Sequence, residues 1–221
     1  NGTLTLSGAA NTWNGTTTVS GGTLTLSGSL TTNGSVSVSS NSTLNITGNL
    51  TKLTNGSFTL GQTTGQTDTI NVSGSGILNT GGTGISLGTG NVGTGILNIT
   101  GGTVTTGGIT LAGNNSTLNV SGGSLNSGAA QLIDLAFGVS SAALSISGTG
   151  SVATNYLRVG QGGSSASTGV INLGDGTVGG NLSVTSNNGD ISQSGPLTVT
   201  GTSSLNASTG NITLTNALNN F

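Results

Sequence analysis

The chain has 221 residues, of which 43 are Gly and 3% are charged, and it contains no Cys, His or Met. The composition excludes a zinc site, which needs Cys or His ligands, and the two basic residues are too few to neutralise the phosphates of a nucleic acid. At 31% hydrophobic residues the chain is poorer in apolar side chains than an ordinary globular domain. This low apolar content favours a stack of coils over a compact globule, because each coil lines only a narrow interior that it shares with its neighbours.

Short strand patterns recur from one end of the chain to the other. In each, two apolar residues stand two positions apart, so both side chains point to one side of a strand, and Gly, Asn and Ser clusters separate the patterns. The predicted strands contain, in chain order, Leu4 and Leu6, Leu24 and Leu26, Val36 and Val38, Leu44 and Ile46, Phe58 and Leu60, Ile70 and Val72, Ile85 and Leu87, Leu97 and Ile99, Ile109 and Leu111, Leu118 and Val120, Leu144 and Ile146, Leu157 and Val159, Ile171 and Leu173, Leu182 and Val184, Leu197 and Val199, and Ile212 and Leu214. The segment at 129–137, AAQLIDLAF, is short and uncapped, which predicts a strand with a corner rather than a helix.

A repeated phrase predicts the length of one coil. Between 69 and 173 the phrase S/T-x-L-N-V/I-S/T-G-G starts near 69, 96, 117, 143 and 170, at intervals of 21 to 27 residues, and such a period is typical of solenoids. We predict one all-β parallel solenoid over 1–221, with two or three strands in each of about nine coils and a length of roughly 40 Å. The sequence of the repeat differs between three regions, 1–60, 61–173 and 174–221.

The same phrase predicts which side chains face in and out. Leu118 and Val120 should face the interior, while Asn71, Asn98 and Asn119 should align on the outside as a ladder. A row of small antiparallel sandwiches is the competing architecture, but one Trp, one Tyr, three Phe and one Pro are few for such cores and turns.

Two segments match known repeat phrases. In 2–28 the matching residues are Gly2, Leu4, Leu6, Gly8, Asn11, Trp13, Gly15, Thr17, Val19, Gly22 and Leu24. This segment resembles the passenger-associated repeat of bacterial autotransporters, and Gly189 to Phe221 is similar to repeats of filamentous-haemagglutinin-like exoproteins. The resemblance implies a right-handed parallel β-helix on, or released from, a bacterial surface, in families that serve adhesion, aggregation and biofilm structure. Because the chain begins and stops inside repeats, we expect a fragment of a longer protein or the subunit of an assembly.

The acidic residues are poorly placed for catalysis. The chain has Asp68, Asp134, Asp175 and Asp190 and no Glu, and the separations of these residues are poor multiples of one coil. A Ser nucleophile would lack a His base, and the calcium-binding nonapeptide is absent. We therefore expect solvated or turn-capping Asp residues, no enzyme activity, no metal and no cofactor.

Contact residues are better candidates than reactive ones. Tyr156 and Arg158 should project from one outer face, two positions apart, where they could contact a sugar or a protein. Trp13 is expected to pack at a coil corner. Thr-x-Thr pairs such as Thr3 and Thr5 raise an ice-binding alternative, but the middle coils replace them with Asn and Ser.

The leading hypothesis is a structural extracellular β-solenoid that serves as an adhesin stalk, surface spacer or matrix fibre. One alternative is a filament subunit that stacks end to end through its open sheet edges. Another is a carbohydrate-binding or polysaccharide-degrading β-helix, in which Asp134, Asp175 or Asp190 would converge. The expected partners are copies of the chain itself, assembled end to end or laterally, or surface glycans. Nucleic acid is not expected, and no stretch is long and apolar enough for a membrane span.

Overall fold

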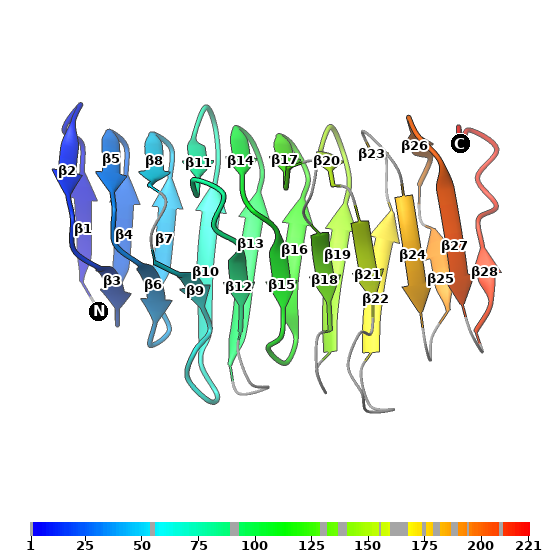
Figure 1. Ribbon diagram of the computed structural model, residues 1–221, viewed down its shortest axis with the longest axis horizontal. Coiled ribbons are helices and arrows are strands. Elements are labelled where there is room, and N and C mark those ends of the chain that lie inside the picture. Colours follow the sequence, from blue (N-terminus) through cyan, green and yellow to red (C-terminus); the bar gives the residue numbers. More distant parts are fainter. Residues whose placement is uncertain are drawn as a thin grey trace.

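The computed structural model describes residues 2–53, 56–88, 93–128, 132–136, 141–154, 156–159, 168–173, 176–178, 182–186, 190–193, 195–207 and 210–221. In this part of the chain all regular structure is β-strand, and the strand pairs are parallel. Successive strands belong to three sheets in rotation, so three strands make one coil, and the coils follow one another along the long axis (Figure 1). The predicted parallel β-solenoid is confirmed, while its right hand stays a prediction.

Sheet A, the longest, begins each coil. Its ten described strands, in spatial order, are β1 (Thr3–Leu6), β4 (Thr23–Leu26), β7 (Thr43–Ile46), β10 (Thr67–Val72), β13 (Thr94–Ile99), β16 (Ser116–Val120), β19 (Ser141–Ile146), β22 (Thr168–Leu173), β25 (Ile191–Gln193) and β28 (Ile212–Thr213). The phrase starts at Thr69, Ile96, Thr117, Ala143 and Val170 lie opposite one another in this sheet. One phrase therefore marks one coil, as predicted.

Sheet B follows sheet A in each coil, after a tight corner. Its nine described strands are β2 (Asn11–Trp13), β5 (Ser29–Thr32), β8 (Asn49–Lys52), β11 (Ile77–Asn79), β14 (Thr103–Thr105), β17 (Ser124–Asn126), β20 (Ser151–Ala153), β23 (Gly176–Val178) and β26 (Leu197–Val199). The predicted number of coils, about nine, is thus close to the number of strands described in the two longer sheets.

Sheet C closes each coil. Its seven described strands are β3 (Thr17–Ser20), β6 (Val36–Ser39), β9 (Phe58–Leu60), β12 (Ile85–Leu87), β15 (Ile109–Leu111), β18 (Leu132–Leu135) and β21 (Tyr156–Val159), and the pair β24 (Leu182–Ser186) and β27 (Ser203–Ala207) continues the stack beside β21. The expected strand with a corner contains β18, and Ala136, which follows this strand, has a φ of 57°. Residues 129–131 and 137 of the predicted segment lie outside the described residues.

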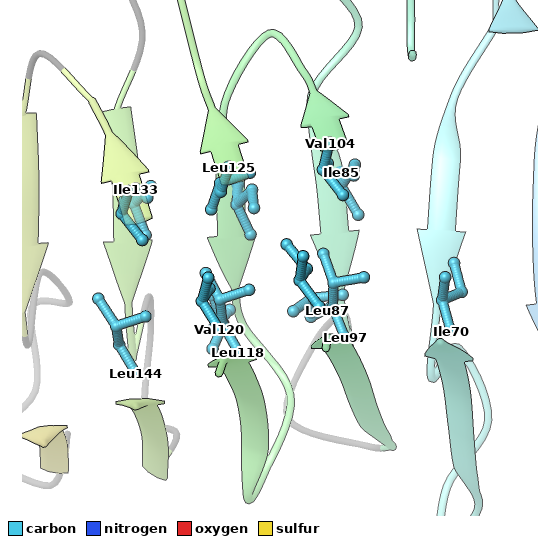
Figure 2. Close-up of a cluster of buried hydrophobic side chains, with 14 of the residues drawn as sticks. Ile70, Ile85, Leu87, Leu97, Val104, Leu118, Val120, Leu125, Ile133 and Leu144 are labelled. Atoms are coloured by element: carbon cyan, nitrogen blue, oxygen red, sulfur yellow. The ribbon is translucent and has the colours of Figure 1, made fainter. Parts of the chain in front are cut away.

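The core is a narrow column of Leu, Ile and Val between the three sheets. Figure 2 shows Leu97, Leu118 and Leu144 from sheet A beside side chains of the other two sheets in one interior. Each of the three is 0% exposed, and full burial of such a side chain stabilises the fold by about 1.5–3 kcal/mol. Leu118 and Val120 face in, as predicted.

The position of Leu4 differs from the prediction. The alternating pattern that Leu4 shares with the other predicted strands predicts an inward side chain, but Leu4 is 59% exposed. Leu24 and Leu44, which lie in register with it on β4 and β7, are buried. In the residues described, β1 pairs on one side alone, with β4, so Leu4 has an apolar neighbour on a single side.

Most strands of sheet B were not predicted from the sequence, and their burial pattern explains why. Most strands of sheets A and C bury two apolar residues, as β15 and β16 do, whereas β5 buries Leu30 and Thr32, and β8 buries Leu50 and Lys52. One apolar residue per strand gives no alternating pair to detect.

Glycine sets the corner between sheets A and B. A Cβ atom built on Gly48 would lie 2.0 Å from the carbonyl oxygen of Gly28, and one built on Gly28 would lie 2.1 Å from that of Gly8. Backbone therefore stacks directly on backbone at this corner, which explains why a Gly follows the strand of sheet A in each of these coils.

We expect the substitution Gly48→Ala to lower the free energy of unfolding by about 1–3 kcal/mol, because the added methyl group overpacks the corner. Gly15→Ala is the matched control, since a Cβ atom there meets no atom within 4 Å. Chemical denaturation of the two variants measures the difference. Equal effects at the two positions would contradict the stacked-corner account.

Candidate functional site

An ion pair occupies the outer face of sheet C. Asp134 on β18 lies in register with Arg158 on β21. The guanidinium binds the carboxylate side-on, with Nε donating to Oδ1 at 2.6 Å and Nη2 donating to Oδ2 at 2.5 Å. The Asp134 side chain is 6% exposed and that of Arg158 is 38% exposed. The hydrogen bonds that Arg158 donates to Asp134 raise the pKa of Arg158 above its ordinary value, so the guanidinium stays charged.

Arg158 was predicted as a contact residue together with Tyr156. The Tyr156 backbone pairs with Leu132, and its side chain lies outside the described part of the structure. Arg158 projects from the outer face, but two of its five N–H groups are already bound to Asp134. Contact with a partner at these two residues stays a prediction.

Sequence analysis missed the pairing of Asp134 with Arg158. The two residues are 24 positions apart, which is close to one coil, so the repeat period contained the signal. We expected a solvated or turn-capping Asp134, and this expectation is wrong because the neighbouring coil places a cation against the carboxylate.

Asp68 is the second buried acid. Its side chain is 0% exposed at the corner between sheets C and A, where the carboxylate accepts backbone N–H groups from Ser42 at 2.8 Å and Gly61 at 3.2 Å. Desolvation by burial raises the pKa of Asp68, and the backbone hydrogen bonds oppose that rise. The residue caps a turn, as predicted, but it is not solvated. It links its own coil to the preceding one.

Lys52 is buried in a polar column at the corner between sheets B and C. Its ammonium group donates to the Leu53 carbonyl oxygen and to Thr83 Oγ1, both at 3.0 Å, and burial lowers the pKa of Lys52. The column consists of the buried residues Thr32, Lys52, Thr80, Thr106, Ser127 and Thr154.

The hydroxyl groups of this column satisfy the corner backbone. Thr106 Oγ1 lies 3.1 Å from the carbonyl oxygen of Thr83 and 3.0 Å from that of Gly108, either of which can accept its single proton, and Ser127 Oγ donates to Thr154 Oγ1 at 2.8 Å. The column thus supplies side-chain donors to the corner, where the carbonyl oxygens of Thr83 and Gly108 also accept backbone N–H groups of Gly107 and Ile85.

The remaining acids do not gather in one place. Asp190 precedes β25 of sheet A, where Oδ1 accepts the backbone N–H of Asn211 at 2.8 Å, whereas Asp134 lies on sheet C. Asp175 lies outside the described residues. Among the residues that are described, no group of three acidic side chains could hold a metal ion.

Asparagine side chains form a ladder on the outer face of sheet A. Each Nδ2 donates to the Oδ1 of the preceding coil: Asn71 to Asn45 at 2.9 Å, Asn98 to Asn71 at 2.9 Å, and Asn119 to Asn98 at 2.8 Å. The predicted ladder of Asn71, Asn98 and Asn119 is confirmed, and it includes Asn45. We call these four residues the amide column.

The first coil leaves an open hollow of about 340 Å³, which Leu4, Val19 and Leu24 help to line. Trp13 packs against the core, and its Nε1 donates to Thr17 Oγ1 at 2.7 Å. This agrees with the expected structural place of Trp13.

Comparison with known proteins adds a family model. A model described as repeats of unknown function (DUF5649) matches residues 160–221, which is less than half of the chain. A search of curated proteins found no match, and a search of solved structures found none either. The chain is a repeat-containing β-helix protein.

The part of the chain that the structure describes contains no helix with the length and apolar character needed to cross a bilayer.

We expect Arg158→Ala to lower the free energy of unfolding by about 2 kcal/mol, because it leaves the Asp134 carboxylate buried beside no cation. Arg158→Lys, which keeps the charge but loses the planar fork, should lose less. Chemical denaturation of Asp134→Ala, Arg158→Ala and the double variant gives the coupling energy. A coupling energy near zero would contradict a structural role for this pair.

Proposed function

We propose that the chain is a structural β-solenoid module of a bacterial surface or secreted protein, acting as an adhesin stalk, a surface spacer or a matrix fibre. The observation that carries the proposal is that the few charged side chains of the chain bind to its own backbone and side chains. Five of the six charged residues in the sequence hydrogen-bond within or between coils, namely Lys52, Asp68, Asp134, Arg158 and Asp190. Groups that could bind or transform a substrate are thus engaged in holding the stack together.

The geometry supports a stiff spacer. Ten strands of sheet A stack in one direction, and at about 4.8 Å per strand they span more than 40 Å. Each coil contacts its neighbours, so length can change by whole coils without disturbing the rest. The resemblance of 2–28 to autotransporter repeats supports the bacterial surface as the location.

A deletion of one whole coil tests the spacer role. Gly95 pairs with Asp68, and Ile96 pairs with Thr117, so removal of 96–116 joins Gly95 to Thr117 in register. In the bacterium that produces the protein, surface labelling of intact cells should detect both the full chain and the shortened one. Attachment of these cells should decrease in steps as further whole coils are removed.

A deletion of the ten residues 107–116 is the control, since it breaks the register and should prevent surface display. Labelling only after lysis would contradict the proposed location. Attachment that is unchanged after removal of several coils would contradict the spacer role.

A further inference from the structure

We propose that the outer face of sheet A packs against the same face of a second copy of this chain. The inference rests on the proposed structural function and names the surface through which a matrix fibre would associate laterally. The face consists of the amide column and a second outward column that runs through Thr69, Ile96, Thr117 and Ala143.

Among the described strands, those of sheet A are the most numerous and, in the middle of the chain, the longest. The middle strands β10, β13, β16 and β19 are five or six residues long, whereas β11, β14, β17 and β20 of sheet B have three. Ten strands of this sheet offer on the order of 600 Å². That area approaches the roughly 800 Å² that each partner contributes to a stable interface.

The amide column is complementary to itself. Each inner Asn donates one N–H to one neighbouring amide and accepts one N–H from the other, and a primary amide has two donors and two acceptor sites. At Asn71 and Asn98, one donor and one acceptor site of the amide therefore remain available for an opposing face. Parallel in-register strands with amide ladders are the kind of surface that pairs in cross-β assemblies.

Charge favours another copy over a charged partner. On β4 through β19, the described outward residues of sheet A carry no charge, and Asp68 of β10 is buried on the inner side. Ile96 and Ala143 add apolar area beside the amides. With a net charge of −2 on 221 residues, two copies repel each other weakly.

The other faces are less suited to this role. Sheet C carries the Asp134–Arg158 pair on its outer side. In sheet B, the Asn79 and Asn126 side chains accept the backbone N–H groups of Gly81 and Gly128 at their own corners. Their amides are therefore used locally, unlike those of the amide column.

Analytical ultracentrifugation of the purified chain over a range of concentrations tests the proposal. The unsubstituted chain should dimerise, and Ile96→Lys should raise the dissociation constant by about tenfold or more, because a charge must be desolvated in the interface. Thr105→Lys is the matched control: it adds the same charge to the outer face of sheet B in the same coil, at an exposed position, and should leave dimerisation unchanged.

Circular dichroism verifies the fold of each variant, and Thr117→Lys replaces Ile96→Lys if the latter does not fold. A chain that stays monomeric would overturn the proposal. The same holds if the monomeric chain is retained on insoluble polysaccharide, because its partner would then be a glycan and not a second copy. Equal effects of the two Lys substitutions, or no effect of either, would also overturn it. A monomeric chain would leave the stalk and spacer roles intact, because these are tested on intact cells.

Discussion

The parallel, in-register stacking of one coil on the next is the interaction on which the structure depends. It turns each position of the coil into a column that runs along the molecule, so a residue is defined by the residues above and below it. The column through Leu97, Leu118 and Leu144 forms the core, the Gly residues let backbone lie on backbone at one corner, and the amide column covers an outer face. What repeats along this chain is the role of each position rather than its identity.

The same constraint decides where ionisable groups can stand. Lys52 replaces Thr in the polar column between sheets B and C, and its ammonium group reaches Thr83 in the next coil. Asp68 lies at the Ser42 position of the corner between sheets C and A and accepts the N–H group of Ser42. Asp134 and Arg158 meet because they hold the same position in consecutive coils. A buried charge of this kind is tolerated when the neighbouring coil offers hydrogen-bond partners, which leaves little charge for recognition and favours neutral contacts.

Much of this architecture could be predicted from the sequence. Alternating pairs such as Leu118 and Val120 identified most strands of sheets A and C, and the phrase interval predicted the register that aligns Asn71, Asn98 and Asn119. Sheet B was largely missed because its inner positions pair one Leu or Val with one Thr, Ser or Lys. The partner of Arg158 was missed because contacts between coils depend on loop lengths, which vary with each repeat. The exposure of Leu4 depends on which strand lies beyond β1, and a pattern within one strand carries no information about that.

Residue-resolved native-state hydrogen exchange tests the central claim most directly, because it reports the free energy of opening for each strand. If each coil is held by its neighbours, amide protection should be highest in the middle strands of sheet A, such as β13 and β16, and should fall toward β1 and β28. The three strands of one coil should show similar protection. Protection that is uniform along the chain, or that follows the sheet and not the coil, would contradict the account.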